Sequence, residues 1–326
     1  MHAINRRDAI KAGALSAAAF SLFGAAPRSL AGTPQPAQPA RKRALRIAHL
    51  TDIHVQPELR AGEGMSACLR HVNSLTDKAD LIITGGDQVM DSFEHDQART
   101  KQLWDLWQNC LATDNSIPLE HTVGNHDIWG WNKKKSKTSG GEKGYGKAWA
   151  CEMFAREKPY KSLDKNGWHI VILDSVQHDP NDENGYIAQI DEEQFAWLES
   201  DLAAARTPTA IFSHVPIFSV CVYNDDPKQK QDNTWKVSGG IMHTDAHRLR
   251  KLFQKHARVK LCVSGHIHQR DRVEFNDVTY ICDGAVCGAW WKGRNAECDE
   301  GYGLINLYDD GAFNHSYQTY GWVAKK

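Results

Sequence analysis

Two hydrophobic patterns alternate along the chain. Short continuous apolar runs, such as Leu45–Leu50 and Asp80–Thr84, are typical of strands buried on both faces of a sheet. Longer segments carry apolar residues at helical spacing, as Phe195, Leu198 and Leu202 do after the candidate N-cap Asp191. The pattern predicts strands at about 44–50, 80–84, 119–123, 168–174, 209–213, 259–263, 278–282, 303–308 and 313–318, and helices at about 64–77, 95–112, 146–156, 191–205 and 244–256. We therefore expect an α/β fold in which two packed mixed sheets have helices on their outer faces.

Short polar blocks stand at the ends of several predicted strands. In chain order they are Asp52-Ile53-His54, Gly86-Asp87, Gly124-Asn125-His126-Asp127, His214 and Gly265-His266-Ile267-His268. Each block alone fits a solvated turn, and a lone histidine is usually structural. Together they supply enough oxygen and nitrogen donors for two metal ions that share one carboxylate. The blocks contain no Cys, so the donors favour Mn, Fe or Zn over Ca or Mg and argue against a zinc finger.

These blocks, in this order, resemble the D-x-H, G-D, G-N-H-D/E, H and G-H-x-H pattern of the calcineurin-like metallophosphoesterase superfamily, over about residues 44 to 320. The resemblance implies a four-layer αββα sandwich. It also implies that one metal is held by Asp52, His54, Asp87 and His268, and the other by Asp87, Asn125, His214 and His266. Asp87 is expected to bridge the two ions through its two oxygens. His126 is expected to stay off the metals and act as general acid.

The residues after Asp87 depart from two branches of the superfamily. Purple acid phosphatases carry a Tyr at the third position after the bridging Asp, where this chain has Met90, so a purple ferric site is not expected. Other phosphatases place an Asp there that orients the catalytic His. Asp91 stands one residue later, so it fits either that orienting role or a solvated loop.

The N-terminal segment reads as an export signal. Arg6 and Arg7 lie in a twin-arginine pattern, followed by an Ala/Gly-rich stretch too short to span a bilayer, so residues 1–31 are predicted to be a signal peptide. A mitochondrial-type or uncleaved amphipathic start is the alternative. Residues 32–43 are predicted to be a flexible Pro-rich spacer, and residues 44–326 a single catalytic domain without a transmembrane segment. We thus expect a periplasmic or secreted protein, exported folded by the twin-arginine machinery.

Export of a folded protein affects both the metal and the cysteines. Loading in the cytoplasm favours Mn or Fe, because competing periplasmic metals are avoided. The eight Cys permit disulfides, and Cys282, Cys287 and Cys298 are the candidates to pair, although such bridges are not needed for folding. The net charge of −1 argues against a nucleic-acid partner.

Two long segments leave from ligand blocks, residues 128–147 and 219–243, and we expect both to overhang the metal centre. Substrate-contact candidates are Trp129, Trp131, Trp290 and Trp291, although the last two fit core packing equally well. The first segment also carries a group of lysines that either attract an anionic part of the substrate or form a solvated surface: Lys133, Lys134, Lys135, Lys137 and Lys143.

The combined prediction is an exported phosphoesterase in which a metal-bound hydroxide attacks phosphorus directly. Its substrate would be a small molecule or a lipid headgroup. We favour phosphodiesterase or broad activity, because the tryptophans offer a pocket for a leaving group. The alternatives are a phosphomonoesterase, a 5′-nucleotidase-like enzyme, for which 326 residues leave no room for the additional substrate domain, and a non-catalytic metal-binding scaffold.

Overall fold

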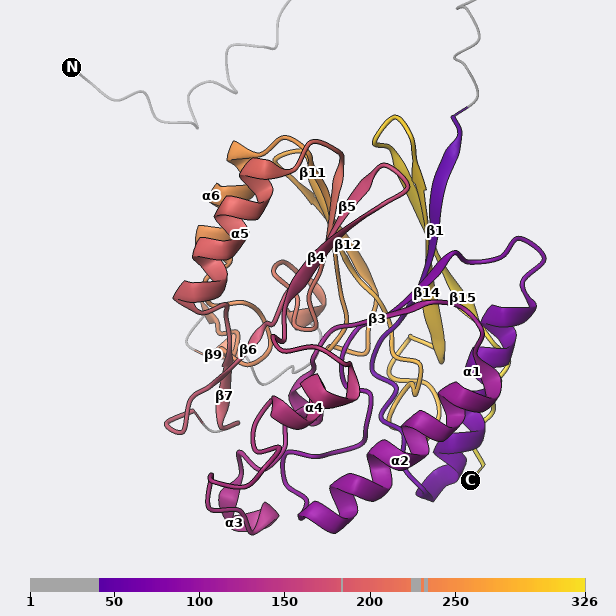
Figure 1. The fold of residues 1–326 in the computed structure, drawn as a ribbon, viewed down its shortest axis with the longest axis vertical. Coiled ribbons are helices and arrows are strands. Elements are labelled where there is room, and N and C mark those ends of the chain that lie inside the picture. The colour runs from indigo at the N-terminus through magenta and orange to yellow at the C-terminus, as the bar shows by residue number, and fades with distance from the viewer. Residues whose placement is uncertain (1–40, 183, 224–229, 232–233, 326) are drawn as a thin grey trace, which may run out of the picture. The chain divides into compact units, whose positions relative to one another are not determined.

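Two mixed β-sheets form the centre of the computed structural model, which describes residues 41–182, 184–223, 230–231 and 234–325 (Figure 1). The five-stranded sheet has the order β15-β14-β1-β2-β3, and the six-stranded sheet has the order β12-β13-β11-β8-β5-β4. The first sheet consists of β1 (Arg43–Leu50), β2 (Leu81–Thr84), β3 (Leu119–His121), β14 (Gly301–Tyr308) and β15 (Phe313–Thr319). The second consists of β4 (Lys161–Lys165), β5 (Trp168–Ile172), β8 (Thr209–Phe212), β11 (Val259–Ser264), β12 (Asp271–Phe275) and β13 (Val278–Cys282).

The remaining elements lie around these sheets. Two small hairpins pair β6 (Val176–His178) with β7 (Tyr186–Ala188), and β9 (Lys230–Gln231) with β10 (Thr234–Trp235). The helices are α1 (Ala61–Ser74), α2 (Gln97–Asp114), α3 (Lys133–Ser136), α4 (Ala148–Met153), α5 (Glu192–Ala204) and α6 (Ala246–Lys255). None of the helices in the described ranges is both long and apolar enough to cross a membrane.

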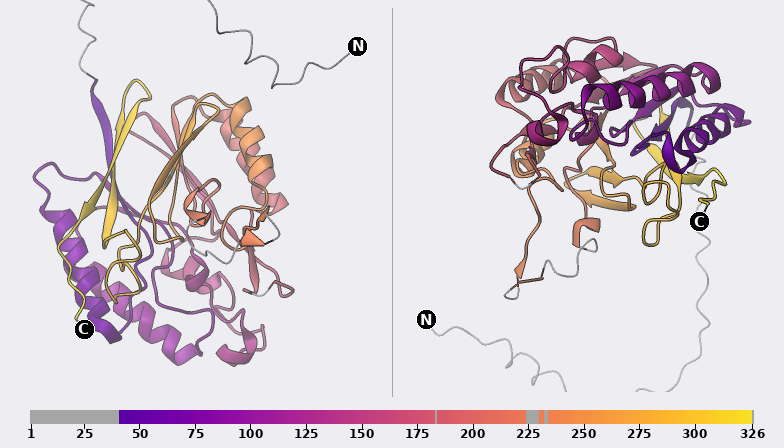
Figure 2. Two further views of the ribbon diagram at one scale, coloured as in Figure 1. Left: turned by 180° about the vertical axis from the view of Figure 1, so that it is seen from behind. Right: turned by 90° about the horizontal axis from the view of Figure 1, so that it is seen from below.

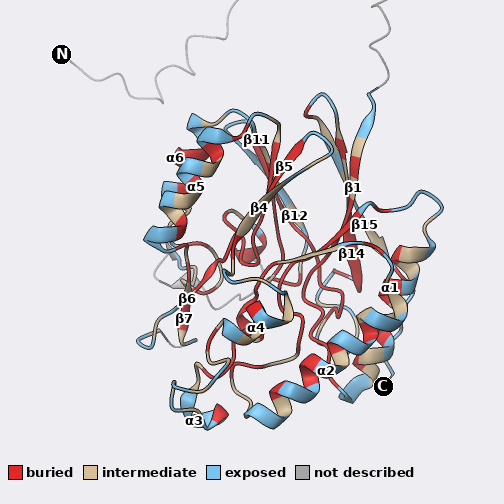
Figure 3. Cartoon of the chain, viewed as in Figure 1, coloured by how far each residue is buried: buried red, intermediate tan, exposed pale blue. Residues whose placement is uncertain are grey.

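Three apolar clusters bind the layers together. The cluster between the sheets includes Ile47 and Ile83 of one sheet and Ile170 and Phe212 of the other. Neighbouring residues on β1, such as Ala48 and Leu50, face the opposite way and pack with α1 and α2, while α5 and α6 cover the outer face of the six-stranded sheet. Figures 2 and 3 show this arrangement, with buried strands inside and helices exposed on their outer sides. The predicted αββα sandwich is therefore confirmed.

The sequence pattern missed the weakly amphipathic strands. β4 and β12 are edge strands of the six-stranded sheet, and both carry charged residues on solvent-facing positions, so neither reads as an apolar run. The short strands β6 and β7 and the helix α3 were also missed.

Two other predictions concern the cysteines and the N-terminus. All eight cysteines are free and buried, so the candidates Cys282, Cys287 and Cys298 do not pair with one another. The predicted signal peptide and most of the spacer lie outside the described residues, whereas residues 41–326 form one unit.

A buried carboxylate joins the two sheets. Asp283, directly after β13, is fully buried and contacts His49 of β1 and His315 of β15, each at 2.8 Å. Burial alone would raise the pKa of Asp283, but the two histidines outweigh it and lower the pKa. Burial would likewise lower the pKa of His315, and here Asp283 outweighs it and raises the pKa, against the nearby Arg272 and Arg270. The interaction therefore stabilises the folded state through a charged pair at the junction of the sheets.

Replacing His315 should make the stability difference depend on pH. His315 has a raised pKa in the folded state, so its contribution is complete below its ordinary pKa of 6.5 and is lost as pH rises through the folded value. We expect His315→Asn to lower the free energy of unfolding by about 1–3 kcal/mol at pH 6. Measured by urea unfolding, this loss should shrink toward about pH 9. The control is the exposed His247→Asn, whose effect on the free energy of unfolding should not vary with pH. A loss for His315→Asn that grows with pH would contradict the charged pair.

Candidate metal centre

The ligand blocks meet because they follow parallel strands. β1, β2 and β3 run parallel in one sheet, and β8 and β11 run parallel in the other. Asp52 and His54 follow β1, Asp87 follows β2, the Asn125–Asp127 turn follows β3, His214 follows β8, and His266 and His268 follow β11. Carboxyl ends of parallel strands lie at one edge of a sheet, so two adjacent sheets bring all five blocks to one place.

One half of the centre contains His54, His268, Asp52 and Asp87. The Nε2 atoms of His54 and His268 lie 3.2 Å apart. Oδ1 of Asp52 is 3.4 Å from Nε2 of His268 and 4.0 Å from Nε2 of His54. Oδ2 of Asp87 is 3.5 Å from Nε2 of His54. The sequence prediction named these four residues as one ligand set, and the structure brings them together.

The other half is built around His214. Its Nε2 lies 3.1 Å from Oδ1 of Asn125, 3.1 Å from Nδ1 of His266 and 3.3 Å from Oδ2 of Asp87. Asp87 thus belongs to both halves, as predicted, but through a single oxygen. Its other oxygen, Oδ1, accepts the main-chain N–H of His126 at 2.8 Å. The bridge through both oxygens of Asp87 stays a prediction from the sequence.

The donor set fits metal cations. His214 and His268 each place Nδ1 at 2.7–2.8 Å from a main-chain carbonyl, of Gly85 and Gly288 respectively, which fixes the tautomer and turns the Nε2 lone pair into the centre. Lone pairs about 3 Å apart repel one another unless a cation or a proton lies between them. That spacing is expected for ligands about 2.1 Å from a common ion. Buried atoms without any hydrogen-bond partner in the centre include Oδ1 of Asp52 and Nε2 of His266.

The electrostatics lead to the same conclusion. Burial lowers the pKa of His54 and of His266 to about 3, so both are neutral imidazoles, the form that binds metals. Burial also acts to lower the pKa of His214, but the Asp87 carboxylate outweighs it and raises the pKa to about 9. Without an ion, a proton on His214 balances the shared carboxylate, and a bound cation would take over that role.

Close backbone approach explains the glycines beside the ligands. A Cβ atom on Gly124 would lie 2.1 Å from Oδ1 of Asp87, and one on Gly265 would lie 2.3 Å from Oδ2 of Asp52. Five candidate ligands also have left-handed backbone conformations, with φ between 45° and 71°: Asp52, His54, Asp87, His266 and His268. Such conformations cost about 1–3 kcal/mol each and collect at functional sites.

Asp127 is a supporting residue whose role the sequence did not reveal, although it stands in the Gly124–Asp127 block. It is fully buried, and its carboxylate accepts main-chain N–H groups of Asp87 at 3.0 Å, Gln88 at 2.7 Å and Gly124 at 2.8 Å. It therefore ties the loop that carries Asp87 to the loop that carries Asn125.

His126 lies at the edge of the centre, with 27% of its side chain exposed. Its ring contacts His54 edge-on, with centroids 4.7 Å apart. Asp91 lies nearby, with its Oδ1 at 3.8 Å from Nδ1 of His126, which is an ion-pair distance but too long for a hydrogen bond. Burial raises the pKa of Asp91, while His126 acts to lower it. The orienting role of Asp91 stays a prediction.

The four tryptophan candidates divide into two pairs. Trp129 and Trp291 are each 1% exposed, and their indole N–H groups bind the carbonyls of His95 and His54. A substrate-contact role for these two is therefore wrong, because their rings fill the core. Trp290 is 38% exposed, and its ring centroid lies 4.6 Å from that of His268. Trp131 lines a cavity beside His126.

The lysine-rich segment is less available to an anion than its sequence indicates. Lys135, Lys137 and Lys143 lie 2.6, 3.5 and 4.0 Å from Glu94, Asp96 and Glu152, respectively. Lys133 lines the cavity beside His126. Of segment 128–147, Trp131, Asn132 and Lys133 line the cavity beside His126, whereas segment 219–243 is only partly within the described residues.

Cys287 is a neighbour of the centre that the sequence did not reveal. Its sulfur lies within 4.8 Å of ring nitrogens of His54 and His268. It is 4.0 Å from Nδ1 of His268, the nitrogen that faces Gly288 rather than the centre. Cys287 therefore lies behind a candidate ligand.

Replacing Asp87 should affect both ion sites, because Oδ2 of this residue faces both halves. We expect Asp87→Asn to weaken binding of each ion by more than about 100-fold, the upper end of the cost of losing a hydrogen-bonded neighbour of a ligand. His54→Ala should mainly empty one site, and the control Asp91→Asn should keep both. Metal analysis and calorimetric titration of the purified variants measure this. Retention of one fully occupied ion in Asp87→Asn would contradict the shared carboxylate.

Comparisons with known proteins agree with this geometry. The family model of the calcineurin-like phosphoesterases matches residues 45–270. A 3′,5′-cyclic-nucleotide phosphodiesterase, alr5338, from Nostoc sp. (strain PCC 7120) is 24% identical over 287 residues, which cover 83% of this chain and 91% of that protein.

Two solved structures have a similar fold. A dimetal phosphatase from Danio rerio has a TM-score of 0.54 at 11% identity and covers 82% of this chain and 94% of its own. GAP50, the anchor in the inner membrane complex of Plasmodium, has a TM-score of 0.52 at 15% identity and covers 86% of each chain. At these identities the likeness concerns the fold alone. With the family model matched over most of the folded region, the chain belongs to the calcineurin-like phosphoesterase family and is a metal-dependent phosphoester hydrolase.

Proposed function

We propose that this protein hydrolyses phosphodiesters of small molecules at a two-metal centre. The observation that carries the proposal is the pair of donor sets that share Oδ2 of Asp87, beside an open cavity bordered by Asn125 and His126. The relative from Nostoc, named as a cyclic-nucleotide phosphodiesterase, supports a diester over a monoester. Two ions, when bound, would supply an activated water and offset the charge of the phosphate oxygens.

The chain's own residues would then organise the reaction. Asp52, His54, Asp87 and His268 would hold one ion, and Asp87, Asn125, His214 and His266 the other. The neutral amide of Asn125 limits the negative charge that a phosphate meets. In the reaction a water oxygen loses a proton to solvent and forms a bond to phosphorus, and the bond to the alcohol oxygen breaks. His126 lies on the open side and is placed to give that alcohol oxygen a proton.

The proposal excludes a covalent intermediate on the protein. Attack of water on phosphorus in one step inverts the phosphorus centre, and no side chain takes part as a nucleophile. A chiral thiophosphate diester hydrolysed in ¹⁸O-labelled water measures the stereochemical result. Retention of configuration would overturn direct attack.

A substrate panel tests the substrate class. Bis(p-nitrophenyl) phosphate, 3′,5′-cyclic AMP, a glycerophosphodiester and p-nitrophenyl phosphate can be compared with Mn²⁺, Fe²⁺ and Zn²⁺. We expect kcat/KM for the diesters to exceed that for the monoester, and activity to be lost with chelator and restored by metal. A preference for the monoester would make the protein a phosphomonoesterase instead.

The proton role of His126 predicts a dependence on the leaving group. His126→Ala should keep both ions and lose about 10²–10⁴-fold in rate with an alkyl leaving group, which needs protonation. With p-nitrophenol as leaving group the loss should be much smaller, because that oxygen leaves as an anion. Metal analysis of the same variant provides the control. Equal losses with both leaving groups would remove the general-acid role, and loss of metal would make His126 a ligand.

We propose further that the enzyme acts in the periplasm after folded export, with Mn or Fe as its metals. This rests on the twin-arginine pattern at Arg6 and Arg7 and on the nitrogen and oxygen donors of the centre. Fractionation of cells that express the wild type and the paired Arg6→Lys, Arg7→Lys variant tests the export. Equal periplasmic amounts of the two would contradict it.

A further inference from the structure

A cavity of about 570 Å³ opens beside Asn125 and His126. Its described lining residues come from four parts of the chain: Asp91, Phe93 and Glu94; Asn125 and His126; Trp131, Asn132 and Lys133; and His178, Pro180, Asp182, Asn184, Gly185 and Tyr186. Because His126 is on the side where the alcohol leaves, a leaving group would extend into this cavity. That step rests on the proposed function, whereas the chemistry of the walls does not.

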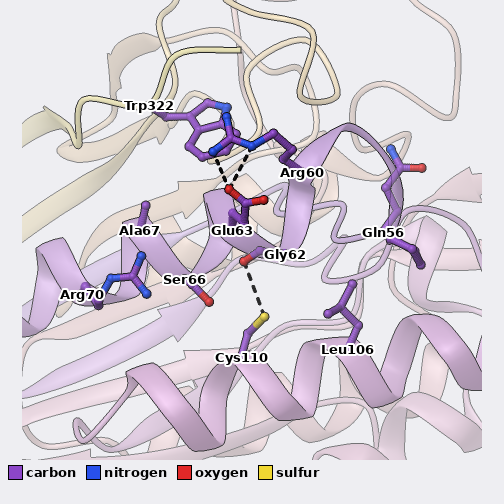
Figure 4. Close-up of a pocket in the computed structure, with 11 residues that line it drawn as sticks. Gln56, Arg60, Gly62, Glu63, Ser66, Ala67, Arg70, Leu106, Cys110 and Trp322 are labelled. Carbon is purple, nitrogen blue, oxygen red and sulfur yellow. Dashed lines mark hydrogen bonds and ion pairs between the residues drawn. The ribbon is translucent and has the colours of Figure 1, made fainter. Parts of the chain in front are cut away.

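The other large cavity lacks these features. It has a volume of about 560 Å³ and lies between α1 and α2 (Figure 4). Its two cations are already paired, Arg60 with Glu63 at 2.9 Å and Arg70 with Asp114 at 3.0 Å. The candidate ligands are absent from its described lining residues.

Aromatic rings form one wall of the cavity beside His126. Phe93 contacts Trp131 and Tyr186 edge-on, with both centroid distances at 6.1 Å. The rings of Trp131 and His178 lie 4.8 Å apart. Lys147, outside the cavity lining, places its ammonium 5.5 Å from the centroid of Trp131 and also binds Asp174, which anchors the Trp131 ring. The rings hold one another in place, so the wall is a preformed apolar surface.

The charges on the walls do not favour an anion. The described lining residues include three carboxylates, of Asp91, Glu94 and Asp182, and one ammonium, of Lys133. Lys135 offsets Glu94 from outside the cavity, at 2.6 Å. Burial first, and then Lys133, lowers the pKa of His178, which disfavours a positive charge on its ring. An anionic leaving group would thus meet three carboxylates in the lining, against Lys133 and, when it is protonated, His126.

We infer that this cavity is the leaving-group subsite, and that it selects an uncharged, flat ring-bearing alcohol, such as a nucleoside, over an anionic one. The aromatic wall supplies contact area for a ring, and Asp91, Asn132 and Asn184 supply polar groups in the lining. Of the two interpretations of the lysine-rich segment, this inference argues against attraction of an anionic part of the substrate.

Two probes of one shape separate charge from size, namely methyl 4-hydroxybenzoate and 4-hydroxybenzoate. Their binding to the metal-free protein is measured by calorimetry, so that no ion attracts the carboxylate. Their methyl phosphodiesters then serve as substrates for the Mn²⁺ enzyme. We expect the uncharged alcohol to bind on the order of tenfold more tightly, equivalent to about 1.4 kcal/mol, and kcat/KM to show the same preference.

Variants test whether the preference for the uncharged alcohol comes from the walls of the cavity beside His126. Trp131→Leu should weaken the uncharged probe about 3–10-fold, mainly in KM, as expected for loss of an aromatic contact. The same change at the half-buried Trp197 of α5, whose ring contacts Tyr160 and which is absent from the described lining of the cavity, is the matched control and should leave binding of both probes unchanged. The pair Glu94→Gln, Asp182→Asn should improve binding of the carboxylate more than binding of the uncharged probe, a result that a merely structural role would not produce.

The outcomes also separate the two proposals. Selective binding without turnover of any diester would support the subsite and contradict the proposed phosphodiesterase function. Turnover with equal kcat/KM for both probes, or with a preference for the carboxylate, would overturn the subsite alone. If neither probe binds measurably and kcat/KM is the same for the two diesters, the leaving-group subsite is also overturned.

Discussion

A single buried oxygen, Oδ2 of Asp87, is the point on which the two halves of the centre depend. It lies 3.5 Å from His54 and 3.3 Å from His214, so each histidine set is positioned through the same carboxylate. The partner oxygen is occupied by the main-chain N–H of His126, and Asp127 fixes the Asp87 backbone from behind. A carboxylate in this position is costly to bury without a compensating charge. Cations between the facing lone pairs would supply that charge. The arrangement that destabilises the metal-free protein is therefore also the source of its affinity for metal.

The buried charge of the centre is held in place by tight turns and close backbone contacts that would be unfavourable elsewhere in the protein. The ligand blocks lie in tight turns after parallel strands, and several of their residues have strained left-handed backbones. Glycines at 124 and 265 let the turns approach one another more closely than any side chain would allow. The apolar clusters on both faces of each sheet hold the strand ends in place against this strain. Ligand binding to the folded state alone adds further stability, because bound ions shift the equilibrium away from the unfolded chain.

The sequence predicted the long-range assembly better than the local details of the loops. Each ligand block follows an apolar strand, and strand ends are recognisable, so the five blocks and the two sheets were found together. The role of Asp127 was missed, because its partners are main-chain amides, which leave no mark in the sequence. The Asp283 pair was missed for another reason, since His49 lies 234 residues away and only the pairing of the sheets brings the two together. Trp129 and Trp131 show the limit most clearly. They are two residues apart in a loop without a period, and one fills the core while the other lines a cavity.

The centre is closed on one side and open on the other, and substrate specificity arises on the open side. Behind His268 the chain is closed by Gly288, Cys287 and the partly exposed ring of Trp290. Beside His126 the chain opens into a cavity. Apart from Asn125 and His126, the described residues of the open side come from the Asp91–Glu94 and Trp131–Lys133 segments and from the β6–β7 hairpin, which lie outside the ligand blocks. A change in these loops can therefore alter the leaving group without moving a ligand. This explains why the family assignment, which rests on the ligand blocks, defines the reaction but leaves the substrate to be read from the loops.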